Sequence, residues 1–358
     1  MMMCNRKADR VYIAILMMFF AIFLPVSTNA EDQKIYRIGY LEPGPYWIFS
    51  HEIEAIKKSL AEMGWKDKIE FPSDAYISPG WEEDKKPLWA VKANELMSRK
   101  DIDLIIAAGT DGAAVILKAN NGKIPIVAIS VSDPIKSKFI LNEKDSGIDN
   151  FTVRVVPNQF KRMFEIFHDV VGFKKIGLVY SDTENGMRYA NVEEARQVAK
   201  ERNFEVIEYK NVSSAEKQEE CLSGLKYLAE QKVDAFFIPS LNCFDWKASD
   251  VKMLLDFLSE KKIPSFARNG TRDVKAGALM GFSTVDFSGR GKFVADKIVR
   301  ILQGEKPRSL PMVDNAIPKI SLNLHVAEKI GFNPPFDIMA ASDELFQEIT
   351  LPEDRLVK

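Results

Sequence analysis

An internal repeat constrains the fold of this chain more than any other feature of its sequence. Three pairs of segments match in the same order, at offsets between 131 and 139 positions. The pairs are YRIGYLEPG (36–44) with KKIGLVYSD (174–182), DIDLIIAAGT (101–110) with KVDAFFIPS (232–240), and GKIPIVAIS (122–130) with KKIPSFARN (261–269). Because similarity at one offset is the mark of a repeated structural unit, the sequence predicts two similar halves in series.

Each half alternates short apolar strands with amphipathic helices. The strands are bounded by turn residues, which is typical of parallel strands buried on both faces. Apolar residues at helical spacing indicate helices over 52–63, 88–99, 112–119, 159–171, 189–202, 215–231 and 249–261. This alternation predicts an α/β fold class with two similar, doubly wound, parallel-sheet lobes, and the length of 358 residues also exceeds one ordinary core.

Polar and aromatic loops follow the expected strands in both halves. They are EPGPYWIFSH, GTDG and SVSDP in the first half, and YSDTENGMRY, PSLNCFDW and RNGTRD in the second. Ligands of open parallel sheets bind outside the carboxyl ends of the strands. Two lobes that face each other through these loops would enclose a ligand-binding cleft.

In this order, the segments resemble the ABC-transporter substrate-binding family, which has the type I periplasmic binding-protein fold and includes tryptophan- and tyrosine-binding receptors. The resemblance covers residues 35–335. It rests on the first strand (38–40), DLIIAAGTDGAA, IPIVAISVSDP, KKIGLVYSDTENG, VDAFFIPSLN and, most specifically, the stretch 263–307. It implies a hinge crossed near 150–151, 281–282 and 306–307, so that 33–150 with 282–306 form the N-terminal lobe and 151–281 with 307–358 the C-terminal lobe.

The resemblance also implies a function. We expect a receptor that closes by hinge motion around a small molecule, most simply an amino acid and plausibly an aromatic one, and that serves an inner-membrane ABC permease as a monomer. Asp111 departs from the family, which usually has a small residue or proline there. Two alternatives stay open: a ligand-sensing module for a membrane kinase or chemoreceptor, and a sugar or nucleobase receptor of the same fold.

The first thirty residues are expected to be a signal peptide. Arg6, Lys7 and Arg10 precede the apolar run 11–24, and small residues at Thr28 and Ala30 suit a signal peptidase. The run is short for a membrane span, and no cysteine follows it for a lipid anchor. We therefore expect a periplasmic protein without stable membrane insertion after cleavage, although an uncleaved anchor is the alternative. Cleavage would move the formal charge from −2 to −4, which disfavours nucleic-acid binding.

Two cysteines would remain after cleavage, Cys221 and Cys243. In an oxidising compartment they could pair, because the first lies early in an expected helix and the second just past the next strand. The alternative is two separate buried thiols.

No catalytic or metal-binding motif is present. The sequence has no Gly-x-Ser-x-Gly, no His-Glu-x-x-His and no Cys-x-x-Cys, and its histidines, His51, His168 and His325, are widely separated. Only His51 is close enough to the first loop to reach the cleft. We expect no cofactor and no metal, and an extracytoplasmic enzyme is the least favoured reading.

The candidate ligand-binding residues stand at the strand ends. Gly109, Thr110 and Asp111 begin a helix, where backbone N–H groups and the Thr110 hydroxyl suit a ligand carboxylate, or where the side chains simply cap the helix. If Asp111 turns inward, it would receive an ammonium instead. Tyr46 and Trp47 offer aromatic faces or cover the first lobe.

Further candidates follow the later strands. Ser130, Ser132 and Asp133 end one strand, and the resemblance makes Asp133 a partner for a ligand amine, whereas the alternative is a turn before Pro134. The second half contributes polar side chains that donate and accept hydrogen bonds, namely Tyr180, Asn185, Ser240, Asn242 and Asn269.

Overall fold

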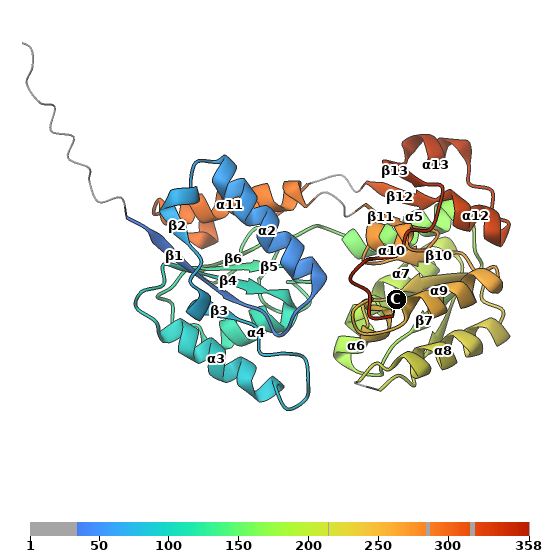
Figure 1. The fold of residues 1–358 in the computed structure, drawn as a ribbon, viewed down its shortest axis with the longest axis horizontal. Coiled ribbons are helices and arrows are strands. Elements are labelled where there is room, and N and C mark those ends of the chain that lie inside the picture. The colour runs from blue at the N-terminus through green and yellow to red at the C-terminus, as the bar shows by residue number, and fades with distance from the viewer. Residues whose placement is uncertain (1–33, 214, 284–286, 316–318, 358) are drawn as a thin grey trace, which may run out of the picture. The chain divides into compact units, whose positions relative to one another are not determined.

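The computed structural model describes residues 34–213, 215–283, 287–315 and 319–357. Two β-sheets form within these ranges, each covered by helices (Figure 1). The expected signal peptide, 1–30, lies outside the described residues. None of the helices in the described ranges combines the length and apolar composition that a membrane crossing needs.

The first sheet has the strand order β2-β1-β4-β5-β6, with β3 also paired to β1, and all pairings are parallel. Its strands are β1 (Tyr36–Leu41), β2 (Ile69–Glu70), β3 (Tyr76–Ile77), β4 (Leu104–Ala108), β5 (Ile126–Ile129) and β6 (Phe151–Val153). In register, Ile38 lies beside Leu104, and Ile105 lies beside Ile126. β4 and β5 are buried along their whole length, which explains their unbroken apolar sequences.

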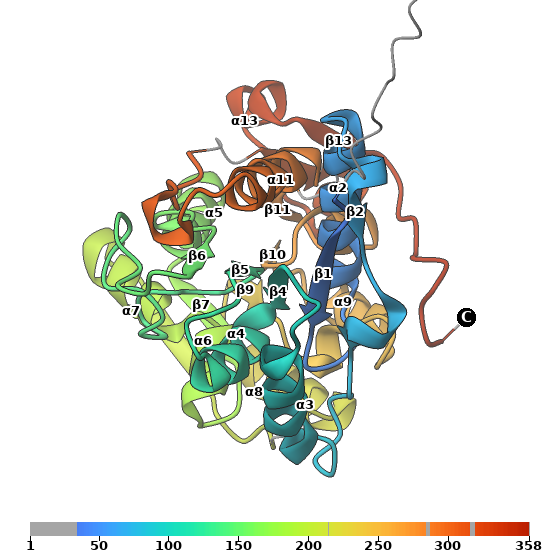
Figure 2. The same cartoon turned by 90° about the vertical axis from the view of Figure 1, so that its left-hand side faces the viewer.

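Helices cover both faces of this sheet. α2 (Trp47–Glu62) and α11 (Ser288–Leu302) pack together on one face, and α3 (Lys86–Ser98) and α4 (Gly109–Ala119) lie on the other (Figures 1 and 2). On the first face Ile53 and Ile56 share a cluster with Val294 and Ile298. The lobe is therefore completed by a helix that comes from far along the chain.

The second sheet has the order β13-β12-β11-β10-β9-β7-β8. Its strands are β7 (Lys175–Val179), β8 (Glu205–Tyr209), β9 (Ala235–Ile238), β10 (Ser265–Ala267), β11 (Met280–Phe282), β12 (Ile320–Asn323) and β13 (Glu344–Phe346). All pairings are parallel except that of β11 with β12, which is antiparallel. The antiparallel pair departs from the parallel sheet that the sequence predicts. Its strand β12 joins the sheet only after the chain has crossed to the second lobe for the last time.

Two apolar clusters lie on the two faces of the second sheet. Helices α5 (Gln159–Val171), α7 (Val192–Arg202) and α12 (Leu324–Ile330) contribute to one cluster, and α8 (Gln218–Glu230) and α9 (Val251–Glu260) to the other. The shorter helices are α6 (Glu184–Tyr189), α10 (Thr271–Lys275) and α13 (Phe336–Ala341), and 3₁₀ turns lie at Lys66–Lys68, Ser73–Ala75, Asn242–Phe244 and Pro307–Ser309. The predicted class, doubly wound α/β in two lobes, is thereby confirmed.

The connections between the two sheets differ in detail from the expected crossings. Residues 151–153 form β6 and pair with β5, so the chain leaves the first sheet after Val153 rather than near 150–151. After α11, Leu310 and Met312 still pack in the first sheet's clusters, so the last crossing comes later than 306–307. The two crossing segments lie side by side, with a parallel bridge between Val155 and Val313.

A buried lysine fastens these connections. Lys297 of α11 is 2% exposed, and its Nζ donates to Thr152 Oγ1 at 3.1 Å, Val153 O at 3.3 Å and Pro311 O at 2.6 Å. Burial lowers the pKa of Lys297 to about 7. One side chain thus ties α11 to both segments that lead into the second sheet.

Candidate functional site

A cavity of about 1550 Å³ is lined by residues of both sheets. Its walls come from the segments that follow β1, β3, β4, β5 and β6 of the first sheet and β7, β8, β9, β10 and β11 of the second. The lining residues include all the predicted candidates at the strand ends except Asp133 and Tyr180: Tyr46, Trp47, Gly109, Thr110, Asp111, Ser130, Ser132, Asn185, Ser240, Asn242 and Asn269. The polar loops thus meet at the carboxyl ends of the strands, where parallel sheets hold ligands.

The glycine at the start of α4 is needed for conformation and for packing. Gly109 has a φ of 76°, and a Cβ at this position would lie 2.6 Å from Cζ of Phe49. The helix begins after Ala108, and no side chain caps it. Thr110 and Asp111 therefore lie within the first turn of α4 and do not cap it.

Thr110 and Asp111 instead use their side chains for contacts across the cavity wall. Thr110 Oγ1 accepts a hydrogen bond from the Ser132 N–H at 3.2 Å, which ties the end of β4 to the end of β5. The Tyr189 hydroxyl of α6, in the second lobe, donates to Asp111 Oδ2 at 3.1 Å. Burial raises the pKa of Asp111, and the Tyr189 hydroxyl opposes that rise.

An arginine that the sequence analysis did not select occupies the opposite wall. Arg268 follows β10; its Nε donates to Asn191 Oδ1 at 2.7 Å and its Nη1 to Ser240 Oγ at 2.6 Å. Its Nη2 reaches Ser132 Oγ at 3.3 Å, and the guanidinium stacks 4.5 Å from the centre of the Phe160 ring. Burial lowers the pKa of Arg268. The signal for it was its position, directly after a buried strand and before Asn269.

Most of the remaining candidates lie close to Arg268 or at the mouth of the cavity. Ser240 donates to Asn269 Oδ1 at 2.5 Å, and Asn269 is buried. Tyr46 comes from the first lobe; burial raises the pKa of its hydroxyl to about 12, and nearby Arg268 opposes that rise. Asn185 accepts from Arg188 Nη1 at 3.3 Å at the mouth of the cavity.

Aromatic side chains form much of the apolar surface of the site. Trp47 is 7% exposed and stacks edge-on against His51 and Phe287, with the guanidinium of Arg272 at 5.4 Å from its ring centre. His51 itself does not line the cavity; its Nδ1 is 2.7 Å from the Trp47 carbonyl oxygen. Further rings in the lining are Phe49, Trp81, Trp89, Phe160, Tyr189 and Phe282.

The structure places two predicted site residues elsewhere. Asp133 Oδ1 accepts from the N–H groups of Ile135 and Lys136 at 3.0 and 2.9 Å, so it forms the turn before Pro134 that was the alternative. Tyr180 is fully buried, and its hydroxyl donates to Glu208 Oε2 of the neighbouring β8 at 2.7 Å. Its backbone still pairs with Tyr209, so its side chain follows the pleat into the core.

Two further guanidinium groups line the cavity beside the crossings. Arg154 forms a salt bridge with Asp314 at 2.6 Å, which joins the two crossing segments. Arg290 of α11 lies 5.1 Å from the centre of the Phe287 ring. Deeper in this lobe Ser130 donates to the buried Glu52. Sequence reasoning missed Arg154 and Arg290 because charged side chains on helices and linkers usually face solvent.

Contacts outside the cavity also connect the two lobes. Lys136, in the loop after β5, bonds Glu193 Oε2 at 2.7 Å and Glu194 Oε1 at 2.6 Å of α7. Together with the contacts of Asp111 and Ser132, these ion pairs hold the two lobes against each other on the side of α6 and α7.

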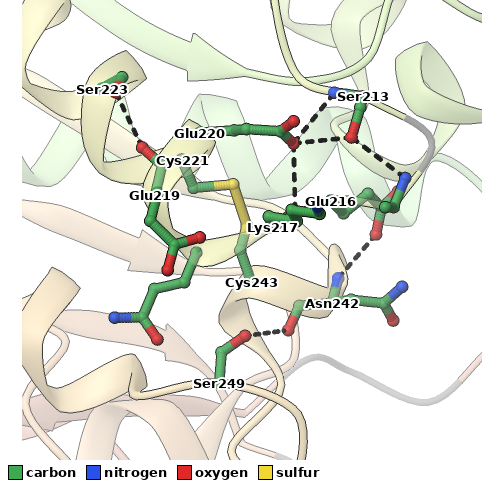
Figure 3. The surroundings of a disulfide bond; sticks show 12 residues. Ser213, Glu216, Lys217, Glu219, Glu220, Cys221, Ser223, Asn242, Cys243 and Ser249 are labelled. Carbon is green, nitrogen blue, oxygen red and sulfur yellow. Dashed lines mark hydrogen bonds between the residues drawn. A yellow bond between two sulfur atoms is a disulfide. The ribbon is translucent and has the colours of Figure 1, made fainter.

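The rim of the second lobe is held by a disulfide between Cys221 and Cys243 (Figure 3). The bond joins α8 to the 3₁₀ turn at Asn242–Phe244, so the paired alternative of the sequence analysis is the one observed. Beside it, the Asn242 N–H donates to Glu216 Oε2 at 2.7 Å (Figure 3). Burial raises the pKa of Glu216 to about 7.

The lining of the cavity offers hydrogen-bonding groups, charged groups and aromatic rings. Within the described part of the chain, no group of three or more histidine, cysteine, aspartate or glutamate side chains is placed to hold a metal ion. Both lobes contribute charged groups of both signs to the lining, among them the Asp111 carboxylate of the first lobe and the Arg268 guanidinium of the second, together with flat aromatic rings.

Comparison with known proteins identifies a family. The family model for ABC transporter substrate-binding proteins matches residues 50–345. A Streptococcus pneumoniae domain solved in complex with L-Trp is 23% identical with a TM-score of 0.71, over 87% of this chain and 100% of that chain. A conserved domain protein from Vibrio cholerae is 21% identical with a TM-score of 0.71, again over 87% and 100%. An Agrobacterium vitis solute-binding protein with bound allitol is 13% identical with a TM-score of 0.57, over 83% and 98%. No curated protein matches the sequence.

Proposed function

The chain belongs to the family of ABC transporter substrate-binding proteins, and from this premise we propose that it is a periplasmic receptor that binds an amino acid and delivers it to an inner-membrane permease. The ligand would occupy the cavity between the lobes. The protein would perform no chemistry on it.

The observation that carries this proposal is the pair of opposite charges in one aromatic cavity. Asp111 comes from the first lobe and Arg268 from the second, and both line the space together with Trp47 and Phe160. An amino acid has one cationic and one anionic group close together, so it complements both walls at once. The aromatic faces suit an apolar or aromatic side chain.

Hinge closure follows from the same arrangement. A ligand that contacts both walls stabilises the closed state by the difference between its affinities for the closed and the open forms. The first lobe would offer Thr110, Asp111 and Ser132, and the second would offer Ser240, Arg268 and Asn269. A permease could then distinguish the loaded receptor from the empty one.

A thermal-shift screen of residues 31–358 tests the proposal. The screen compares L-amino acids with sugars, nucleobases and small organic acids. A ligand present at one hundred times its dissociation constant adds about 2.7 kcal/mol to the stability, a shift of several degrees or less. We expect amino acids, above all aromatic ones, to raise the midpoint. If sugars or nucleobases alone raise it, the amino-acid assignment is wrong.

A further inference from the structure

Arg268 is a half-buried, partly desolvated cation without a counter-charge among the residues that the structure describes. Its guanidinium donates three hydrogen bonds to neutral acceptors, the side-chain oxygens of Asn191, Ser240 and Ser132. Within the described ranges no carboxylate lies within ion-pair distance of its guanidinium. A guanidinium has five N–H donors, so donors on Nη1 and Nη2 remain for another acceptor. Burying a charge without a partner is costly, which favours an anionic ligand at this position.

The side chain is also held in one orientation. Asn191 and Ser240 fix the inner edge of the guanidinium fork, and the Phe160 ring supports its face at 4.5 Å. Such a fixed fork matches the two oxygens of a carboxylate, with which it forms two parallel hydrogen bonds. The other cavity arginines differ in this respect: Arg154 already has Asp314 at 2.6 Å, and Arg290 lies on the Phe287 ring without a hydrogen bond to any described residue that would hold its fork in place.

A carboxylate that could receive the ammonium of an amino acid lies near Arg268. Ser132 accepts from Arg268 through its hydroxyl and donates to Thr110 through its N–H, so the guanidinium is connected to the start of α4 through one residue. The next residue along, Asp111, presents its carboxylate to Tyr189 in the cavity. A carboxylate and a guanidinium therefore flank the same short stretch of wall.

We propose that Arg268 binds the carboxylate of the ligand, with the ammonium on the side of Asp111, so that the receptor selects carboxylate-bearing ligands through its second lobe. This assignment rests on the proposed function, whose cavity it uses. It adopts the alternative of the sequence analysis in which Asp111 receives the ammonium, and it assigns the carboxylate to Arg268 instead of the start of α4.

Titration calorimetry with two sets of probes tests the assignment. One set is L-tryptophan, tryptamine and indole-3-propionate, and the other is L-leucine, 3-methylbutylamine and 4-methylpentanoate. In each set the second compound lacks the carboxylate and the third lacks the ammonium. On the wild-type protein we expect the amine to bind weaker than the amino acid by on the order of a hundredfold, because a desolvated charge pair is lost.

Three variants locate the effect. In Arg268→Gln the difference between amino acid and amine shrinks to a few-fold, and in Arg268→Lys it is partly restored. Arg290→Gln removes the same charge from another wall of the same cavity and keeps the full difference. The unliganded thermal midpoint of each variant reports whether it is folded, and the wild-type comparison of probes requires no variant.

The outcomes separate the two proposals. If an amino acid and its amine bind the wild type equally, or if Arg290→Gln and not Arg268→Gln removes the difference, Arg268 is not the anchor although the receptor still binds amino acids. If the acids without an ammonium bind as tightly as the amino acids and need Arg268, the anchor holds and the amino-acid assignment is wrong. If neither probe set binds, both proposals are overturned.

Discussion

Removing the disulfide between Cys221 and Cys243 should cost a predictable amount of stability. The two residues are 22 positions apart, and a cross-link that closes a loop of this length restricts the unfolded chain by about 3 kcal/mol. Both side chains are fully buried in one apolar cluster, so neutral reduced thiols would stay in apolar surroundings without burying a charge. Most of the cost therefore comes from the unfolded state.

Denaturation of the mature protein by guanidinium, followed by tryptophan fluorescence, measures this cost. Trp246 packs in the same cluster as both cysteines and reports the unfolding of the second lobe. The comparison uses oxidised wild type, reduced wild type and the double variant Cys221→Ala with Cys243→Ala. We expect the reduced wild type and the double variant to unfold at similar denaturant concentrations, with free energies of unfolding about 3 kcal/mol below that of the oxidised protein.

The same experiment can refute the reasoning. If the reduced protein is as stable as the oxidised one, the bond does not restrict the unfolded chain. If only the double alanine variant is destabilised, packing of the sulfur atoms carries the effect rather than the cross-link. Ligand affinity provides a second readout, because Glu216 and Asn242 beside the bond line the cavity.

Three further predictions follow from contacts described above. In urea denaturation, Gly109→Ala should destabilise the protein by more than Gly122→Ala. Both glycines have a φ of 76°, which costs another residue about 1–2 kcal/mol, but only at Gly109 would the added Cβ clash with Phe49. Equal losses of stability would contradict the packing argument. The pKa of Lys297 is about 7 in the folded protein and about 10.5 in the unfolded chain, so unfolding takes up a proton between these pH values and stability should rise with pH across that range. Lys297→Met should flatten this rise when denaturation is measured at several pH values, and an unchanged slope would exclude Lys297 as its source. Lys136→Gln removes ion pairs between the lobes and should weaken ligand binding a few-fold at low ionic strength and less at high ionic strength, because exposed ion pairs are weak and screened by salt. If calorimetry shows an effect that does not depend on salt, Lys136 has no electrostatic role in binding.

The sequence was sufficient for the fold because the relevant signals are local. Apolar runs such as those of β4 and β9 identify buried strands, and the helices between them have ordinary amphipathic patterns. The repeat then supplies the division into two similar lobes. The region in which the polar loops meet also follows, since parallel strands place their carboxyl ends at one edge of the sheet.

The individual side chains were harder to predict because their direction depends on pairing. Tyr180 reads as a loop residue, yet its backbone pairs with Tyr209 and the pleat carries its ring into the core. Arg268 reads as a solvated cation, and only the neighbouring Asn191, Ser240 and Phe160 show that it is held in the cavity. Neither outcome follows from local spacing.

The crossings illustrate the same limit. The run that forms β6 is apolar and short, and nothing in it shows whether it adds to the first sheet or begins the second. Its pairing with β5, and the bridge between Val155 and Val313, are contacts between distant parts of the chain.

The return of α11 to the first sheet has a consequence for how the chain can fold as it is made. All six strands of that sheet are complete once residue 153 has been synthesised, but the helix that covers Ile53 and Ile56 spans 288–302 and follows on the order of ten seconds later. Until then this apolar face is uncovered and open to aggregation. A fragment that ends after β6 would keep that defect permanently, so the first lobe can be isolated only if α11 is joined to it by rearranging the order of the chain.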